Sequence, residues 1–215
     1  MAGLRDKQRS SRRLRIMMTA RRLFNARGYQ EATLEEIAAQ SELSTVTVLN
    51  YFGSKGGLLV AIQTQFDVEL RKDIAPIIAD PPADPIEAVS SFFTIVFDHA
   101  LATLERHVWK HVWANLFLEA GTDLGKGLAQ NERELLDDFT IMLEALQRRG
   151  AIRPEIDIKA LGEILHSIQA IRSMQFMSDP AMSRSDLDAV MLRDFTLVMR
   201  PYLRAPGKGA RQTGG

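Results

Sequence analysis

Apolar residues recur along this chain at the three- and four-residue spacing of amphipathic helices. Between residues 10 and 27, for example, they fall at Ile16, Ala20, Leu23 and Phe24. No segment alternates apolar and polar residues as a half-buried strand would. The pattern therefore predicts an all-α fold of about nine helices.

The first predicted helices are short and closely spaced. The first covers residues 10–27, and Gly28 follows it as a natural stop. Thr33 can cap a second helix, with Glu36 three residues on as its capping-box partner. A turn at residues 41–43 ends this second helix.

A third helix is predicted between Ser44, which can cap it, and Gly53, which ends it. Val48 and Phe52 are four residues apart and are expected to face the core, so the polar residues of this helix face outward. Two short helices joined by a tight turn, the second of them polar on one side, are typical of a helix-turn-helix. In that motif the second helix enters the DNA major groove, and the pattern here covers residues 33–52.

The rest of the chain predicts a larger helical body. A fourth helix runs from about residue 54 to 74, and a proline-rich boundary follows. Asp84, Pro85 and Glu87 there have the pattern of an N-cap, a first-turn proline and a capping-box partner. Five more helices are predicted, over residues 85–104, 106–119, 127–149, 155–177 and 184–203.

These elements divide the chain into four parts. The expected parts are a disordered basic N-terminus (1–9), a DNA-binding domain (10–70), a helical regulatory and dimerisation domain (71–204) and a disordered tail (205–215). Together they predict a three-helix head carrying the helix-turn-helix, followed by a larger body for ligand binding and dimerisation.

Composition narrows the class of protein. The chain has 215 residues, 46% of them hydrophobic, which is enough for a substantial core. It has no cysteine, which excludes disulfides and thiolate zinc sites and fits a reducing cytoplasm. The longest unbroken apolar run, residues 58–62, is far too short to span a bilayer, and the N-terminus lacks the apolar core of a signal peptide. We therefore expect a cytoplasmic protein without a membrane partner.

The net charge of zero hides an uneven distribution. Residues 1–57 carry ten Lys or Arg and five Asp or Glu, whereas the remainder carries 17 basic and 22 acidic residues. A basic head on an acidic body indicates that only the head meets a polyanion. The alternative is a basic tail that merely keeps the chain soluble.

The third predicted helix carries side chains suited to reading DNA. Thr45, Thr47 and Asn50 offer hydrogen bonds, and Asn can pair with adenine through two of them. Val46 and Leu49 offer apolar contact to thymine methyl groups. Phosphate contacts, which position the helix without reading sequence, are expected from Thr33, Ser44, Tyr51 and Lys55. Three arginines of the basic segment can reach the backbone or an adjacent minor groove: Arg9, Arg12 and Arg13.

Over about residues 10–70 the chain resembles the DNA-binding domain of TetR-type transcriptional regulators. The matching positions are Ala20, Leu23, Phe24, Gly28, Tyr29, Thr33, Ile37, Ala38, Leu43, Ser44, Thr47, Tyr51, Phe52, Ser54, Lys55 and Leu58. The resemblance implies an all-helical homodimer whose C-terminal body usually binds a small molecule and dimerises through its last two long helices.

The chain departs from the family pattern at four places. Ser41–Glu42 stand where the family usually has a small residue and a glycine in the turn. Val46 replaces a glycine or other small residue, Leu49 replaces an aromatic residue, usually Tyr, and Gly56 replaces an acid. We therefore expect fewer hydroxyl contacts to DNA, and more contact to thymine methyls, than the family pattern implies.

Aromatic residues in the body suggest a ligand pocket. Trp109, Trp113 and Phe117 follow one another at four-residue steps on one helix face and can line an apolar cavity. The alternative is an ordinary bundle core. The candidate ligand-binding residues are Phe97, Trp109, Trp113, Phe117, Met142 and His166.

The last two predicted helices carry long apolar stripes. Two such helices meeting their symmetry mates would form a four-helix interface, although packing within one chain explains part of each stripe. The candidate interface residues are Leu161, Leu165, Ile168, Leu187, Met191 and Phe195.

The sequence offers little for catalysis or metal binding. His107 and His111 have the spacing of a two-His metal site, but no third ligand accompanies them, so a solvated or hydrogen-bonded pair is expected. No catalytic triad, nucleophile motif or dinucleotide-binding fingerprint is present. We predict no metal and no cofactor, and a protein that is not an enzyme.

These inferences together predict a homodimeric transcriptional repressor. It would bind double-stranded DNA at a palindromic operator and be released by a small apolar effector bound in the C-terminal domain. One alternative is a DNA-binding regulator that has no small-molecule ligand and acts through a protein partner. The other is a helical enzyme that only resembles a regulator.

Overall fold

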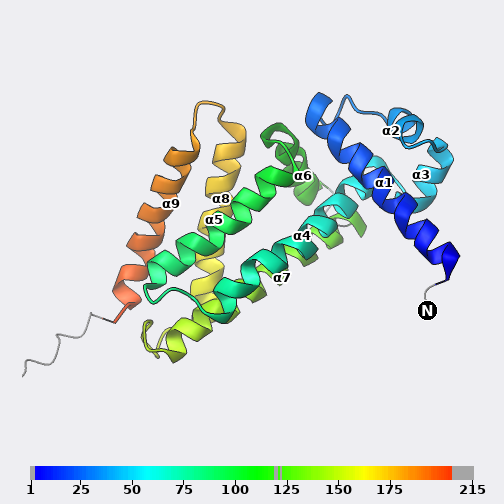
Figure 1. Ribbon diagram of the computed structural model, residues 1–215. Helices are drawn as coiled ribbons and strands as arrows, with labels where there is room; N and C mark the ends of the chain where they lie inside the picture. Colours follow the sequence, from blue (N-terminus) through cyan, green and yellow to red (C-terminus); the bar gives the residue numbers. More distant parts are fainter. Residues whose placement is uncertain (1–2, 119–120, 122, 205–215) are drawn as a thin grey trace, which may run out of the picture.

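The structure is a computed structural model that describes residues 3–118, 121 and 123–204. Nine α-helices and one short 3-10 helix make up this part of the chain (Figure 1). They are α1 (Leu4–Arg27), α2 (Leu34–Gln40), α3 (Thr45–Phe52), α4 (Lys55–Ala79), α5 (Pro85–Thr103), α6 (Arg106–Leu118), α7 (Asp123–Arg148), α8 (Ile158–Ser178), α9 (Arg184–Met199) and η1 (Arg200–Tyr202). The predicted all-α fold is confirmed.

The first helix begins earlier than the sequence predicts. Helix α1 starts at Leu4, so the expected disorder is wrong for residues 4–9. The Gly3 amide donates to the Asp6 carboxylate over 3.3 Å at the start of this helix, which gives the first turn a local partner. The predicted disorder of residues 1–2 and 205–215 falls outside the described residues.

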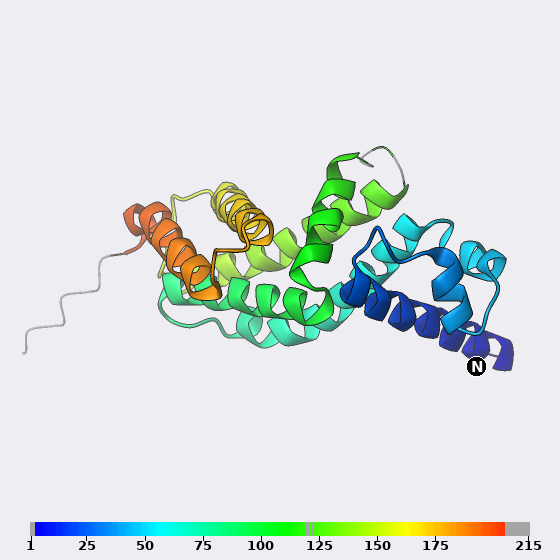
Figure 2. The ribbon, with the colours of Figure 1, turned by 90° about the horizontal axis from the view of Figure 1, so that it is seen from above.

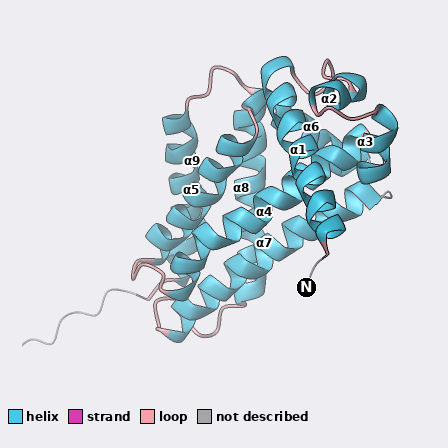
Figure 3. Cartoon of the chain, turned by 45° about the vertical axis from the view of Figure 1, so that its right-hand side comes forward, coloured by secondary structure: helices cyan, strands magenta, loops and turns pink. Residues whose placement is uncertain are grey.

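The molecule is elongated, with the helix-turn-helix at one end (Figures 1 and 2). Helices α1 to α3 form this end, which we call the head. Helices α5 to α9 form the body, and α8 and α9 lie side by side at the end farthest from the head. Helix α4 runs from the head along α5 and α7, as Figure 3 also shows.

Helix α4 is longer than predicted. It continues past residue 74 through Pro76 to Ala79, and the predicted domain boundary at residue 70 therefore falls inside one continuous helix. A proline within a helix removes one hydrogen bond, but Ile77 and Ile78 beyond it pack against the core and retain the helical turn. Head and body are thus joined by a rod rather than by a flexible linker.

An aromatic cluster fixes the centre of the body. Phe92 and Phe93 of α5 meet Phe139 of α7 at ring-centroid distances of 5.1 and 4.6 Å, and Phe195 of α9 stacks on Phe93 at 5.5 Å. All four rings are fully buried. Burying a side chain of this size contributes about 1.5–3 kcal/mol, so the cluster is a main source of body stability.

Helix α5 is the one described helix that is long and apolar enough, by composition, to cross a membrane. Its buried residues instead pack in the body core, Phe92 and Phe93 among them. Asp84 caps its start, accepting hydrogen bonds from the amides of Ile86 (2.7 Å) and Glu87 (3.4 Å). These are the features of a core helix, which passes the same composition test.

Candidate nucleic-acid interface and ligand cavity

Helix α3 is anchored to the head by one face only. Val48 is fully buried and packs in the same core as Ile37 and Ala38 of α2. The predicted cap is confirmed, because the Ser44 hydroxyl accepts from the Thr47 amide over 3.2 Å. Gly53 ends the helix with φ +73°, a conformation that favours glycine.

The opposite face of α3 is open to solvent. Val46 is 67% exposed and Leu49 39% exposed, and Asn50 is exposed beside them. Thr45 and Thr47 are half-buried at the edges of this face. The Thr47 hydroxyl already forms a 2.9 Å hydrogen bond with the hydroxyl of Ser44. Asn50 is therefore the most available hydrogen-bonding side chain on the exposed face.

The turn before α3 is strained at Glu42. This residue has φ +56°, the left-handed region that a side chain disfavours by roughly 1–2 kcal/mol. The position is one where the family pattern has glycine, and the backbone explains that preference. The Glu42 carboxylate forms an ion pair with Arg15 of α1 over 3.4 Å.

The Thr33 cap is confirmed, but the predicted capping box forms only in part. The Thr33 hydroxyl accepts from the Glu36 amide over 3.1 Å. The Glu36 carboxylate instead pairs with Arg27 of α1 over 2.6 Å. The fold brings Arg27 close to Glu36, so the Glu36 carboxylate forms an ion pair instead of the capping-box hydrogen bond to the backbone.

Lys55 was expected at the DNA surface, yet its ammonium group is turned into the head. It donates to the Gln30 carbonyl over 2.9 Å and lies 4.6 Å from the centroid of the Tyr29 ring. Burial lowers the pKa of Lys55 from its ordinary value, while Glu31 raises it. The structure therefore gives this lysine a role within the head, which weakens its assignment as a phosphate contact.

The basic residues of α1 are better placed for a polyanion. Arg9, Arg12 and Arg13 are exposed on the N-terminal half of this helix. The Arg13 guanidinium lies 4.9 Å from the centroid of the Phe52 ring at the end of α3. Arg9 and Arg12 have no ion-pair partner in the described part of the chain. Their charges are available for phosphate groups.

A cavity in the body lies between five helices. Its cavity volume is about 60 Å³, within about 590 Å³ of space between atoms that includes open solvent. Its walls come from α4, α5, α6, α7 and α8. Lining residues from these helices include Phe66, Phe97, Trp109, Trp113 and Met177.

The predicted ligand-binding residues fall into three groups. Phe97, Trp109 and Trp113 line the cavity as expected. Met142 is buried in the core and is absent from the cavity wall, and His166 lies behind the wall, with its Nε2 atom 3.4 Å from Glu132 Oε2. The side chain of Phe117 lies outside the described residues.

The polar part of the cavity wall was not among the residues predicted from the sequence. Gln63 and Asp67 of α4 line the cavity, as do Asn131 and Glu132 of α7. The signal for the first two was available, since they are four residues apart within an otherwise apolar stripe. Gln169 and Ser173 of α8 complete the polar wall, joined by a 2.9 Å hydrogen bond.

Asp67 has an unusual environment. The pKa of its carboxyl group is raised to about 7: burial is the largest cause, the Glu132 carboxylate also raises the pKa, and Arg71 and a hydrogen bond from Gln63 lower it. The Gln63 amide donates to Asp67 Oδ1 over 3.3 Å. Asp67 Oδ2 and Gln63 Oε1 are buried without a hydrogen-bond partner. Buried acceptors of this kind are costly unless a ligand satisfies them.

Helix α6 connects the cavity to the head. The Asn25 side chain of α1 donates to the Thr103 carbonyl over 3.3 Å and accepts from the Glu105 amide over 2.9 Å. Two histidines of α6 face the same region: His107 Nε2 lies 3.3 Å from the Phe24 carbonyl, and the His111 ring lies 5.2 Å from that of Tyr29.

The contacts of His107 and His111 with the head show how this four-residue histidine pair is used in the fold. His107 and His111 meet the head instead of a third ligand. Within the described part of the chain no group of three His, Cys, Asp or Glu is placed to hold a metal ion.

Most of the predicted dimer residues point inward, and their assignment is wrong. Five of them, Leu161, Leu165, Leu187, Met191 and Phe195, are buried in the core of their own chain, and Ile168 is half-buried. The stripes therefore pack α8 and α9 onto the body. The apolar residues that these helices leave exposed are Ile164 (50%), Ile171 (53%), Leu192 (50%) and Leu197 (74%).

The head thus has the three elements of a DNA-reading domain: a fixed helix pair, an exposed α3 face and a basic flank. These features define a helix-turn-helix protein with a separate helical body. Residues 16–62 match the family model described as bacterial regulatory proteins, tetR family.

A curated relative agrees with this match. The HTH-type transcriptional regulator BetI of Stenotrophomonas maltophilia is 34% identical over 88 residues, which are 40% of this chain and 45% of that protein. The match thus spans less than half the length of the relative. Residues 16–62 therefore resemble the helix-turn-helix domain of TetR-family regulators.

Solved structures resemble nearly the whole chain. A TetR-family regulator from Pectobacterium atrosepticum has a TM-score of 0.73 at 21% identity, covering 93% of this chain and 98% of that one. Thermus thermophilus FadR, a TetR-family repressor in complex with lauroyl-CoA, gives 0.71 at 22% identity, covering 94% and 100%. A transcriptional regulator from Saccharomonospora viridis in complex with choline gives 0.68 at 20% identity, covering 91% and 100%. The fold of this chain is that of TetR-family regulators.

Proposed function

We propose that this protein is a cytoplasmic transcriptional regulator, a homodimeric repressor that a small molecule releases from a palindromic DNA operator. The observation that carries the proposal is the exposed face of α3, with Val46, Leu49 and Asn50 presented beside the basic start of α1. The match of residues 16–62 to regulators favours a regulator over the helical-enzyme alternative.

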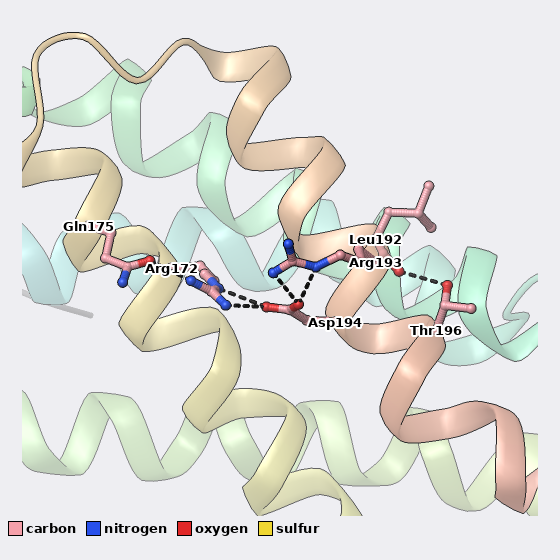
Figure 4. A network of polar contacts seen from close by, with 6 residues as sticks. All are labelled: Arg172, Gln175, Leu192, Arg193, Asp194 and Thr196. Carbon is pink, nitrogen blue, oxygen red and sulfur yellow. Dashed lines mark hydrogen bonds and ion pairs between the residues drawn. The ribbon is translucent and has the colours of Figure 1, made fainter.

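The far end of the body supports a dimer. Helices α8 and α9 leave apolar residues exposed that a second copy could cover. Beside them, Asp194 of α9 accepts from Arg172 of α8 over 2.7 Å and from Arg193 over 2.8 Å (Figure 4). Asp194 and Arg172 are half-buried, and this charge-assisted hydrogen bond links α8 to α9.

The cavity supports response to a small molecule rather than to a protein partner alone. Trp109 of α6 lines the cavity, and the same helix meets the head through His107 and His111. A ligand that shifts α6 would therefore change the spacing of the two heads in a dimer. A coupling of about 1–3 kcal/mol would change operator affinity by roughly 5- to 150-fold.

Selection of bound DNA from a random double-stranded pool tests the proposal. We expect one enriched sequence with two inverted half-sites whose centres are about one helical turn apart. A pool without enrichment would contradict sequence-specific binding, and a single unrepeated half-site would contradict the dimer. Repeating the selection with candidate effectors then tests release.

A further inference from the structure

Among the described residues of the cavity wall, two of the three buried polar atoms that lack a partner are hydrogen-bond acceptors, and both lie on α4. Two acceptor atoms on α4, Asp67 Oδ2 and Gln63 Oε1, are buried in the wall without partners. Asn131 Nδ2 on α7 is a third buried atom without a partner, and it is a donor suited to a ligand oxygen. A ligand that donates hydrogen bonds toward α4 would satisfy both acceptors at once.

The charge of the wall has the same sign throughout. Asp67 and Glu132 are the charged residues among the described residues that line the cavity. Arg71 lies one turn beyond Asp67 on α4, but its guanidinium is paired with Glu134 and with Asp138 on α7. His166 is not a lining residue, and its Nε2 atom lies 3.4 Å from Glu132 Oε2. The negative charge that faces the cavity is therefore not matched by a cation in the wall.

The remaining walls are aromatic. Phe66 and Trp109 meet edge to face with centroids 6.0 Å apart, and Trp113 and Phe97 line the same space. The Trp109 indole nitrogen donates to the Ala100 carbonyl over 3.0 Å, which fixes the orientation of the ring. Aromatic rings attract cations through their faces and also bury apolar groups.

We propose that the cavity binds an organic ammonium ion, with its charged nitrogen on Asp67 and Gln63 and its apolar part against Trp109 and Trp113. This deepens the proposed function, on which it rests only for the role of the ligand as effector. It replaces the purely apolar effector that the aromatic pattern alone suggested. Solved structures of this fold hold either lauroyl-CoA or choline, so the fold itself does not select the charge.

The chain provides its own reporter for a test. It contains two tryptophans, and both line the cavity, so intrinsic fluorescence reports on cavity occupancy. We would titrate the full-length protein at pH 8 with hexylamine, hexanol and hexanoate, which share an alkyl chain and differ in charge. The proposal expects saturable fluorescence changes with hexylamine at concentrations at least about tenfold lower than with hexanol, and none with hexanoate.

Two variants test whether the charge of Asp67 contributes to ligand binding separately from the apolar part of the cavity. Asp67→Asn keeps the size of the side chain and should weaken hexylamine binding at least about tenfold, or about 1.4 kcal/mol, while hexanol binding stays unchanged. Glu69→Gln removes an exposed carboxylate two residues away on the same helix and should change neither. Equal binding of hexylamine and hexanol, tighter binding of hexanoate, or an unaffected Asp67→Asn variant would overturn the proposal.

The titration contains no DNA. Its failure would therefore leave operator binding intact, and failed DNA selection would leave the ammonium site intact. Circular dichroism melting of each variant checks that the body is folded before binding is compared.

Discussion

At the scale of single residues, Asn50 carries most of the expected sequence selectivity. Its amide is exposed on α3, whereas the hydroxyls of Ser44 and Thr47 are bonded to each other. An asparagine that pairs with adenine through two hydrogen bonds contributes about 1–3 kcal/mol of discrimination.

We therefore expect Asn50→Ala to weaken operator binding by about 1–3 kcal/mol and to relax base choice at one position of each half-site. Competition titrations with single-base operator variants measure both effects. Thr94→Ala, an exposed residue of α5 in the body, is the matched control. Unchanged base preference in Asn50→Ala would remove this residue from the reading set.

The raised pKa of Asp67 predicts how the stability of the protein changes with pH. Its folded-state pKa of about 7 lies above the ordinary value of 3.8. The unfolded chain therefore ionises first as pH rises, so this residue lowers the free energy of unfolding between those values and most strongly above pH 7. Burial is the largest cause of this raised pKa; Glu132 and Glu134 of α7 also raise it, and Arg71 and a hydrogen bond from Gln63 of α4 lower it.

Asp67→Asn should accordingly stabilise the unliganded protein. The gain has an upper limit of about 4 kcal/mol at pH 8, from about 1.36 kcal/mol per pKa unit, and is smaller at pH 5. Urea denaturation of both proteins at the two pH values measures it. A variant that is less stable than the parent at both values would contradict the assignment of Asp67 as a strained cavity acid.

At the scale of elements, α1 extends the proposed DNA-binding surface beyond α3. The helix begins at Leu4, so the exposed Arg9 and Arg12 are held on an ordered helix rather than on a flexible tail. A cation on an ordered helix loses less conformational entropy when it binds a phosphate. Lys55, which the motif assigns to a phosphate, has its ammonium bonded to the Gln30 carbonyl.

Replacing both Arg9 and Arg12 by Ala should reduce the salt dependence of operator binding. Each phosphate contact contributes about 0.9 to the slope of log K against log salt concentration, so the double variant should lose about 1.8 per subunit. Binding titrations across a salt series measure the slope. Arg200→Ala, at the opposite end of the molecule in η1, should leave it unaltered, and the same slope in all three proteins would exclude α1 from phosphate contact.

At the scale of the whole molecule, the question is which surface meets a second copy. Helices α8 and α9 use their strongest apolar stripes to pack onto the body, with Leu187 and Phe195 fully buried. Charged substitutions at these two positions would therefore unfold the body instead of separating a dimer. The exposed residues on the outer face are the ones to change.

Leu197→Glu combined with Ile171→Glu should weaken self-association by at least about 100-fold, because both side chains would bury a charge in the interface. Sedimentation equilibrium gives the dissociation constant. Val68→Glu, at an exposed apolar position of α4, is the control and should leave the assembly unchanged. A dimer that persists in the double variant would place the interface elsewhere.

Much of the fold follows from local sequence. Ser44, Thr33 and Asp84 each cap the helix they were expected to cap, because capping depends on residues two or three positions away. The exposed face of α3 is likewise set by the helical period once Val48 is buried. The sequence alone therefore determined most of the helices, the helix-turn-helix and the face that we propose meets DNA.

Only the tertiary structure decided which side chains share a site. Asp67 and Trp109 line the same cavity, the Glu36 carboxylate pairs with Arg27 instead of completing its capping box, and the apolar stripes of α8 and α9 turn inward. Each outcome depends on contacts between residues far apart in the chain, and local periodicity carries no information about which helix lies opposite. The negative charge of the cavity wall depends on how five helices pack together. The tertiary structure therefore decided the class of ligand that we propose.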